Sequence, residues 1–232
     1  QTLTFKRAAT LGGISFDGKE SSIIVDSSDG SSTFDGEIST TIDNTGILTI
    51  QGGNTSTIAK AVGAEGGALS AINVTGASDA NFLSTIYANA ITIGMGTITI
   101  ASGANVTGTI DNVSASGTGN LILSGDATVA SAVGATHSLN GITAGAANTT
   151  SAFSSSVRAT NISAGAGTIA FGGAVDADVN FSANGTVTIA DGNTITGKVT
   201  TAINNTGTLT SLGTNKVTGT VGSADHALYL VN

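Results

Sequence analysis

Side chains that could act as nucleophiles, general acids or bases, or metal ligands are few in this chain of 232 residues. It contains no Cys, which excludes a Cys nucleophile, disulfide bridges and Cys-based zinc sites. Its two histidines, His137 and His226, occupy equivalent places in two copies of one phrase, and the third copy has Gly67 there. A place that also accepts Gly is typical of a solvent-exposed surface, so we predict neither a metal site nor acid–base chemistry at the histidines.

The acidic residues near the N-terminus offer two further candidates. Asp17 and Asp35 belong to two copies of a Phe-Asp-Gly phrase, with Glu37 nearby, so they would stack in a repeat and could form the acid pair of a polysaccharide-cleaving site. A solvated corner explains them better. The segment Asp26–Glu37 has acids at the first and twelfth positions of a calcium loop, but Ser31 stands where an EF-hand requires Gly. An EF-hand is therefore excluded, and an irregular calcium site in this segment stays open.

No catalytic, cofactor-binding or metal-binding residue is therefore assigned, and the chain is predicted not to be an enzyme. The net charge is −8 and only seven residues are Lys or Arg, so we expect no basic patch and no nucleic-acid partner. No apolar run approaches the roughly 18 residues of a membrane-spanning helix, so we expect no direct membrane insertion.

The composition predicts an all-β protein that is rich in turns. Gly contributes 33 residues and Pro none, only 9% of residues are charged, and the residues that usually cover helix surfaces are scarce. With 40% hydrophobic residues the chain can bury a core, which argues against disorder. Seven of the fifteen acidic residues precede residue 44 and suggest a distinct N-terminal segment: Asp17, Glu20, Asp26, Asp29, Asp35, Glu37 and Asp43.

Short echoes recur at a spacing of 18 residues, between 16–19 and 34–37 and between 167–170 and 185–188. This period is close to one turn of a β-solenoid. Polar and apolar residues alternate in segments such as Thr97–Ile100, which is typical of half-buried strands. Asn-Gly and Asp-Gly pairs separate the strands; they could make hairpin turns, but the spacing favours solenoid corners.

Longer echoes favour the same architecture. Residues 96–108 align without gaps with residues 185–197, and residues 41–49 align without gaps with residues 202–210. Residues 109–112 begin in the same way as the segments 41–49 and 202–210. A phrase beginning Val-Gly occurs three times, at 62–69, 133–139 and 221–228. Its spacings, 71 and 88 residues, differ by 17, which is about one turn. A super-repeat of several turns that gains or loses a whole turn explains this difference.

These patterns predict a right-handed parallel β-helix. Residues 41–232 are expected to form one continuous solenoid and residues 1–40 an irregular N-terminal cap. At roughly 20 residues a turn, the chain as a whole is expected to make about 11 turns. Only 4% of residues are aromatic, which suits a narrow core of small side chains. The absence of Pro suits strands that donate hydrogen bonds to both neighbouring turns.

Thr-x-Thr pairs are a further pattern, because flat threonine ladders bind ice on some solenoids. Their spacing is uneven, and Thr is an ordinary outward residue of a strand, so we expect no ice-binding face. The pairs are Thr97/Thr99, Thr107/Thr109, Thr186/Thr188, Thr208/Thr210 and Thr218/Thr220.

Several phrases resemble the passenger regions of rickettsial surface cell antigens of the outer membrane protein B type. They are residues 205–210 (Asn-Thr-Gly-Thr-Leu-Thr), residues 215–222 and the three Val-Gly copies, and the resemblance covers about residues 40–232. It implies an exported autotransporter passenger on the bacterial outer membrane, which adheres to host cells and helps to form the surface protein layer. The family's translocator barrel has no counterpart in these residues, so we expect a passenger fragment. No functional residue of the family maps onto a particular position.

We therefore expect a non-enzymatic passenger fragment that acts in host-cell adhesion or invasion, or in surface-layer formation, with a host-cell surface receptor protein as its partner. A carbohydrate-active β-helix enzyme is one alternative, motivated by the fold. A self-assembling structural subunit is the other, since the open ends of a solenoid can stack.

Overall fold

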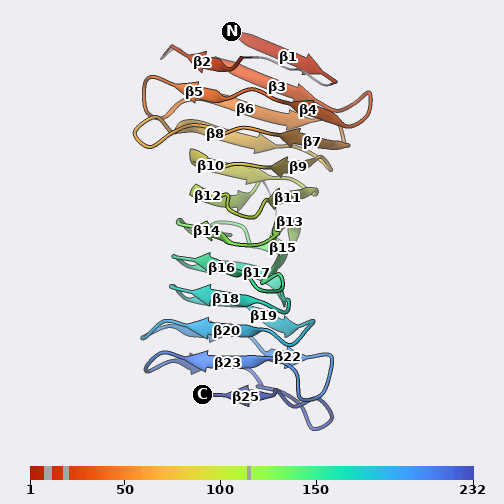
Figure 1. Cartoon of the computed structure of the whole chain (residues 1–232), viewed down its shortest axis with the longest axis vertical. Coiled ribbons are helices and arrows are strands. Elements are labelled where there is room, and N and C mark those ends of the chain that lie inside the picture. Colours follow the sequence, from red (N-terminus) through yellow and green to blue (C-terminus); the bar gives the residue numbers. More distant parts are fainter. Residues whose placement is uncertain (8–11, 18–20, 114–115) are drawn as a thin grey trace.

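The computed structural model describes residues 1–7, 12–17, 21–113 and 116–232, and within these it contains strands and no helix. The strands are parallel and stack as a β-solenoid of about 11 turns, so the predicted right-handed parallel β-helix is confirmed. Figure 1 shows the turns piled along one axis, with the two termini at opposite ends of the pile.

Hydrogen-bonded pairing joins most strands into two long sheets. The first sheet contains β1 (Thr2–Lys6), β3 (Ser22–Asp26), β6 (Thr45–Gln51), β8 (Leu69–Val74), β10 (Ile86–Ile93), β12 (Val106–Asn112), β14 (Ala127–Val129), β16 (Thr150–Phe153), β18 (Thr168–Phe171), β20 (Thr186–Ile189), β23 (Thr208–Ser211) and β25 (Leu230–Val231). The second contains β4 (Ser32–Phe34), β7 (Thr55–Ile58), β9 (Asp79–Phe82), β11 (Thr97–Ile100), β13 (Thr118–Leu123), β15 (Leu139–Ala144), β17 (Val157–Ala164), β19 (Val175–Phe181), β21 (Thr194–Thr196) and β24 (Lys216–Val217), with β22 (Val199–Thr201) also on β19. A third, small sheet pairs β2 (Ile14–Phe16) with β5 (Ile38–Thr40).

The cross-section has three faces, because some long strands turn a corner and join two of them. In β10, Ile86 bridges to Val62 whereas Ile91 pairs with Ile72, so one strand serves two faces. The pairs β10–β12 and β17–β19 shift register in mid-strand, at this corner. Circuits differ in length along the rod, because loops are inserted at some corners and not at others.

Alternation along each strand places the apolar side chains inside. In Thr97–Ile100 the two Ile side chains are buried and the two Thr side chains point outward, as predicted. Each buried Ile or Val contributes about 1.5–3 kcal/mol of apolar transfer free energy, and β-branched residues fit the extended backbone. The core also holds aromatic rings: Phe153 and Phe171 stack at a centroid distance of 5.5 Å.

One of the two short echoes corresponds to a turn, and the other does not. Thr168 pairs with Thr186, which confirms the echo between 167–170 and 185–188. The echo between 16–19 and 34–37 was wrong as a stack, because Phe16 pairs with Thr40 and Phe34 pairs with Ile58. Both of these circuits are longer than the separation of the two phrases, so the phrases cannot come into register. Residues 18 and 19 of that echo lie outside the described residues.

Residues 1–40, predicted to be a cap, form the first turns at one end of the pile (Figure 1). Their strands β1 and β3 belong to the first long sheet, and β3 pairs with β6. Their strand β4 belongs to the second long sheet and pairs with β7. Pairing therefore continues across residue 40.

The three Val-Gly copies stand at corners that share one local backbone conformation. Gly63, Gly134 and Gly222 share a φ of 68–69°, in the left-handed region. Register runs from Val62 through Ile86 and Val106 to Val129, and from Val133 through Val157, Val175 and Ile195 to Val217. The first and second copies are thus separated by three turns plus one face. The second and third copies are separated by four turns plus one face. The predicted difference of one turn is confirmed, and each copy is also displaced by one face.

The Asn-Thr-Gly echo has a packing role as well. A Cβ at Gly46 would lie 2.2 Å from the Phe16 ring, and one at Gly207 would lie 2.3 Å from the Phe181 ring. Both rings are buried and belong to the preceding turn. Only Gly leaves room for a phenylalanine below this corner, which explains why the echo keeps its Gly at both places.

Candidate binding surfaces

The two histidines are not brought together. His137 lies in the loop after Val133 and is half-buried, whereas His226 lies in the loop after Val221 and is exposed. Four turns and one face separate these loops, so the two imidazoles cannot share a metal ion or a substrate. Throughout the described residues, no group of three or more His, Asp or Glu side chains could hold a metal ion.

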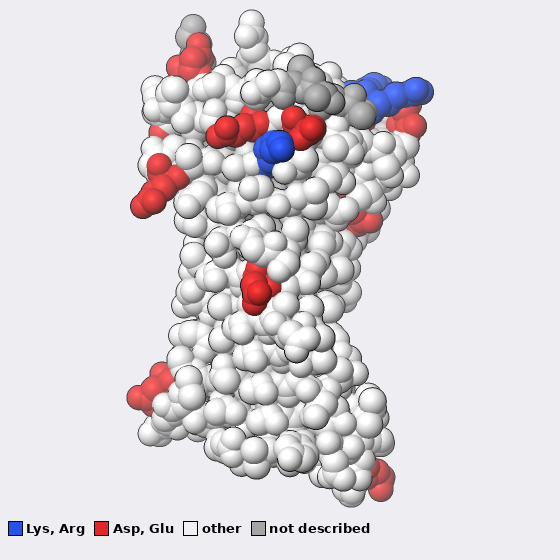
Figure 2. Space-filling model, viewed as in Figure 1, with Lys and Arg blue, Asp and Glu red and all other residues white. Residues whose placement is uncertain are grey.

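The predicted stack of Asp17 and Asp35 does not form, because the strands before them pair with Thr40 and Ile58 rather than with each other. Asp35 instead faces Lys60, with Oδ1 3.8 Å from Nζ, and both side chains are about half exposed. Glu37 and Lys60 line one shallow hollow with Asp35. Figure 2 shows charged side chains gathered near the N-terminal end and few over the rest of this face.

The segment Asp26–Glu37, kept open as a calcium site, uses its most buried carboxylate internally. Asp26 accepts hydrogen bonds from the Ser28 amide at 2.9 Å and from Gln51 Nε2 at 3.3 Å. The Ser28 amide is the main reason why the pKa of Asp26 lies below its usual value. Each carboxylate oxygen thus accepts one hydrogen bond, and Asp26 fixes the turn after β3.

Threonine rows occur on the face formed by β14, β16, β18, β20 and β23. Pairing places Thr150, Thr168, Thr186 and Thr208 in one row. In the adjacent row, Ala152 and Ala170 stand between Thr128 and Thr188. This second row of threonines is therefore interrupted. The Thr97/Thr99 pair lies on a different face, with β13 as its neighbour. The predicted pairs therefore do not make one continuous array.

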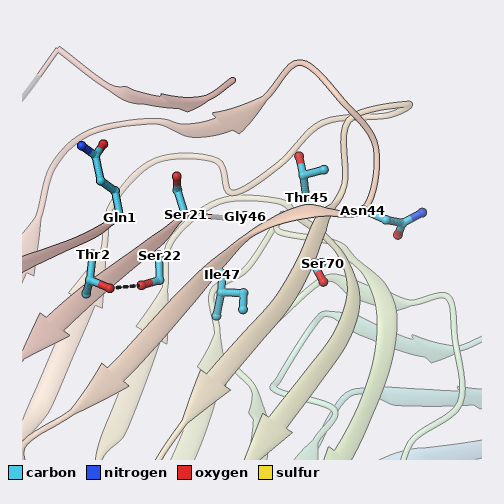
Figure 3. Close-up of a pocket in the computed structure, with 9 residues that line it drawn as sticks. All are labelled: Gln1, Thr2, Ser21, Ser22, Asn44, Thr45, Gly46, Ile47 and Ser70. Carbon is cyan, nitrogen blue, oxygen red and sulfur yellow. Dashed lines mark hydrogen bonds between the residues drawn. The ribbon is translucent and has the colours of Figure 1, made fainter. Parts of the chain in front are cut away.

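A polar groove of about 480 Å³ opens near the N-terminus (Figure 3). It is lined by residues of β1, β3, β6 and β8 and of the segments before the first three. The hydroxyl and amide side chains are those of Gln1, Thr2, Ser21, Ser22, Asn44, Thr45 and Ser70, and Gly46 and Ile47 complete the lining. Thr2 and Ser22 share a hydrogen bond of 2.9 Å between their hydroxyl groups. Among the residues that the structure describes, no charged side chain lines this groove.

A second polar groove, of about 440 Å³, lies in the middle of the rod over β11, β13, β15 and β17. Its walls carry uncharged polar groups: Thr97, Asn120, Asn140, Thr143, Thr160 and Asn161. Asn140 donates from Nδ2 to Asn120 Oδ1 at 3.0 Å, which orients both amides. Gly141 pairs with Asn120 and Asn161 and has no side chain, so the surface is hollow there. The sequence feature that indicates this groove is Gly141, which stands at an outward-facing strand position. Its partners in the two neighbouring strands are Asn120 and Asn161.

Comparison with protein-family models, with curated proteins and with solved structures finds no match for this chain. The part of the chain that the structure describes has no helix with the length and apolar character needed to cross a membrane.

The second ion pair of the described surface should contribute little to stability. Arg158 Nε lies 3.4 Å from Asp176 Oδ2, and both side chains are about half exposed. Exposed pairs of this kind contribute less than about 1 kcal/mol. We expect Asp176→Asn to shift the melting temperature by less than about 3 °C, measured by circular dichroism at low and high salt. A larger loss would mean that the pair supports the corner below it.

Proposed function

We propose that this chain is a surface-exposed autotransporter passenger fragment of a bacterium, which acts in host-cell adhesion or invasion, or in surface-layer formation. Its partner would be a receptor protein on the host-cell surface. The proposal rests on the resemblance of residues 40–232 to rickettsial passenger regions, together with the β-solenoid.

The observation that carries the proposal is the groove over β11, β13, β15 and β17. Its Asn and Thr side chains stand on strands that are hydrogen-bonded on both sides, so they are held in place before a partner arrives. A preorganised surface loses little conformational entropy on binding. Uncharged amides and hydroxyls can exchange hydrogen bonds with water for hydrogen bonds with a protein surface, at low desolvation cost compared with charges.

The test is adhesion of beads coated with the purified protein to host cells. Asn140→Arg places a long charged side chain at the groove, and we expect at least a tenfold loss of bound beads, equivalent to about 1.4 kcal/mol. Thr107→Arg is the matched control, because Thr107 is an exposed residue of β12 outside the groove. Unchanged binding by Asn140→Arg would exclude the groove as the contact surface.

The same preparation separates the alternatives. Absence of binding to any host cell by both soluble protein and coated beads would overturn the adhesion proposal. Turnover of a polysaccharide that Asp17→Ala or Asp35→Ala abolishes would favour a carbohydrate-active enzyme. Electron microscopy that shows end-to-end filaments would favour a structural subunit.

A further inference from the structure

A side chain of the preceding turn clasps the loop after each Val-Gly corner. Ala68 donates its amide to Asp43 Oδ1 at 2.9 Å, and Ala227 donates its amide to Asn204 Oδ1 at 2.9 Å. In the second copy Asp111 accepts two amides of the loop, from Thr136 at 2.8 Å and from His137 at 2.7 Å. The acceptors are the third residues of the echoes at 41–49, 109–112 and 202–210. Two echoes that are separate in the sequence therefore meet at one contact, three times.

Each clasp also has a backbone half. The residue after the acceptor donates its amide to a loop carbonyl: Asn44 to Ala68 at 2.9 Å, Asn112 to His137 at 3.4 Å and Asn205 to Ala227 at 2.9 Å. In the second and third copies this amide also donates to the acceptor side chain, from Asn112 to Asp111 Oδ1 at 2.9 Å and from Asn205 to Asn204 Oδ1 at 3.0 Å. The side-chain halves differ, because two acceptors are carboxylates and the third is an amide.

This difference has a consequence in acid. A carboxylate that accepts backbone amides is weakened as an acceptor when it takes up a proton, whereas an amide oxygen keeps its accepting role at any ordinary pH. Burial alone would raise the pKa of Asp111, but hydrogen bonds from His137, Thr136 and Asn112 together outweigh burial and hold this pKa below its usual value. The clasp is therefore strongest with Asp111 ionised.

We propose that the second clasp is a conformational device in which the Asp111 loop is released in acid while the Asn204 loop stays closed. The device goes beyond adhesion, because it does not depend on which surface binds a partner. The Asp111 carboxylate holds two amides of its loop. Asp43 holds one amide of its loop and also accepts from Asn44 Nδ2 at 3.2 Å.

Other charges near the clasps are few. The titratable groups in the clasped loops are Glu65 in the first, His137 in the second, and Asp225 and His226 in the third. The ion pairs found within the described residues are Lys60–Asp35 and Arg158–Asp176. Arg158 also donates from Nη1 to the Ala135 carbonyl at 3.0 Å, so this cation lies against the second loop. Thr92 of β10, which pairs with Asp111, is uncharged. Asp111 and His137 are thus the titratable groups at the second clasp, and a variant of Asp111 isolates the contribution of the carboxylate.

The sign of the effect follows from the lowered pKa. The contribution of Asp111 is fully present above the unfolded-state pKa of about 3.9 and is lost as the pH falls through the lower folded-state value. The test is backbone amide exchange of the whole chain at pH 6 and at about pH 2.5, expressed as protection factors. We expect the amides of Thr136 and His137 to lose at least tenfold in protection at the lower pH. The Ala227 amide and the core amides of β18 and β20 should keep theirs.

Two exchanges of acceptor make the test sharp. Asp111→Asn copies the natural third clasp and should abolish the acid response of Thr136 and His137. Asn204→Asp should give the Ala227 amide a new acid response without changing its protection at pH 6. Equal protection of Thr136 and His137 at both pH values would overturn the proposal. So would an acid response that persists in Asp111→Asn, or a uniform loss over all amides, which would indicate global unfolding.

Discussion

Gly63→Ala should lower the melting temperature by about 10 °C, because the new methyl group has nowhere to go. A Cβ at this position would lie 2.2 Å from the carbonyl oxygen of Tyr87 in the next turn. That oxygen belongs to the backbone of β10 and cannot move without disturbing the pairing with β8 and β12. The left-handed φ of 69° adds about 1–2 kcal/mol. We expect a total cost of about 3 kcal/mol or more, and a domain of this size loses roughly 2–4 °C for each kcal/mol.

Gly66→Ala is the matched control within the same loop. Gly66 has nearly the same φ, 74°, but no atom lies within 4 Å of the position of its Cβ. The control therefore includes the conformational cost and omits the clash, and we expect a loss of about 4 °C. Thermal unfolding of both variants by circular dichroism gives the comparison. Similar losses of melting temperature in the two variants would show that the close approach of the Tyr87 carbonyl is not the reason why position 63 requires Gly.

Phe171→Ala should be among the most damaging changes within the core. Phe171 is 1% exposed, and its ring stacks on that of Phe153 in the turn before. Removing a buried phenylalanine ring costs about 3–5 kcal/mol, partly because the cavity is not refilled. We expect a fall in melting temperature of about 10 °C or more. Because each turn contacts only its neighbours, amide exchange should increase mainly in β16, β18 and β20.

Phe171→Leu distinguishes volume from aromatic stacking. The substitution keeps most of the apolar volume, and volume-conserving changes in a core usually cost less than about 1.5 kcal/mol. A loss as large as that of Phe171→Ala would mean that the stacked geometry with Phe153, rather than filled space, stabilises these turns. Faster exchange in β1 or β3, far along the rod, would contradict the neighbour-only description of this solenoid.

The regular part of the fold could be predicted because its signals are local. Alternation in Thr97–Ile100 and the echo between 167–170 and 185–188 each lie within one strand or one short turn. The length of each circuit could not be predicted, since loops of different lengths are inserted at the corners. For this reason the sequence suggested a stack of Asp17 on Asp35 that the pairing of Phe16 with Thr40 rules out.

Both halves of each clasp are visible in the sequence as echoes, but the sequence does not show that the two halves touch. The echoes that contain Asp43 and Asp111 were recognised, and so were the Val-Gly copies that follow them in the chain. Their contact depends on one circuit of the chain, which brings Asp111 of one turn over Thr136 of the next. Alignment within each echo cannot reveal a partner in the other. A search for two echoes that recur together, about one turn apart, would have found the pair.

The direction of the hydrogen bonds between turns has a mechanical consequence. In a pile of parallel turns these bonds run along the rod, so a force that pulls the two ends apart loads them directly. The end turn should peel away first, and each released circuit of roughly 20 residues adds up to about 70 Å of extended chain. Under tension the rod would lengthen in steps, each of which dissipates work while the remaining turns stay folded.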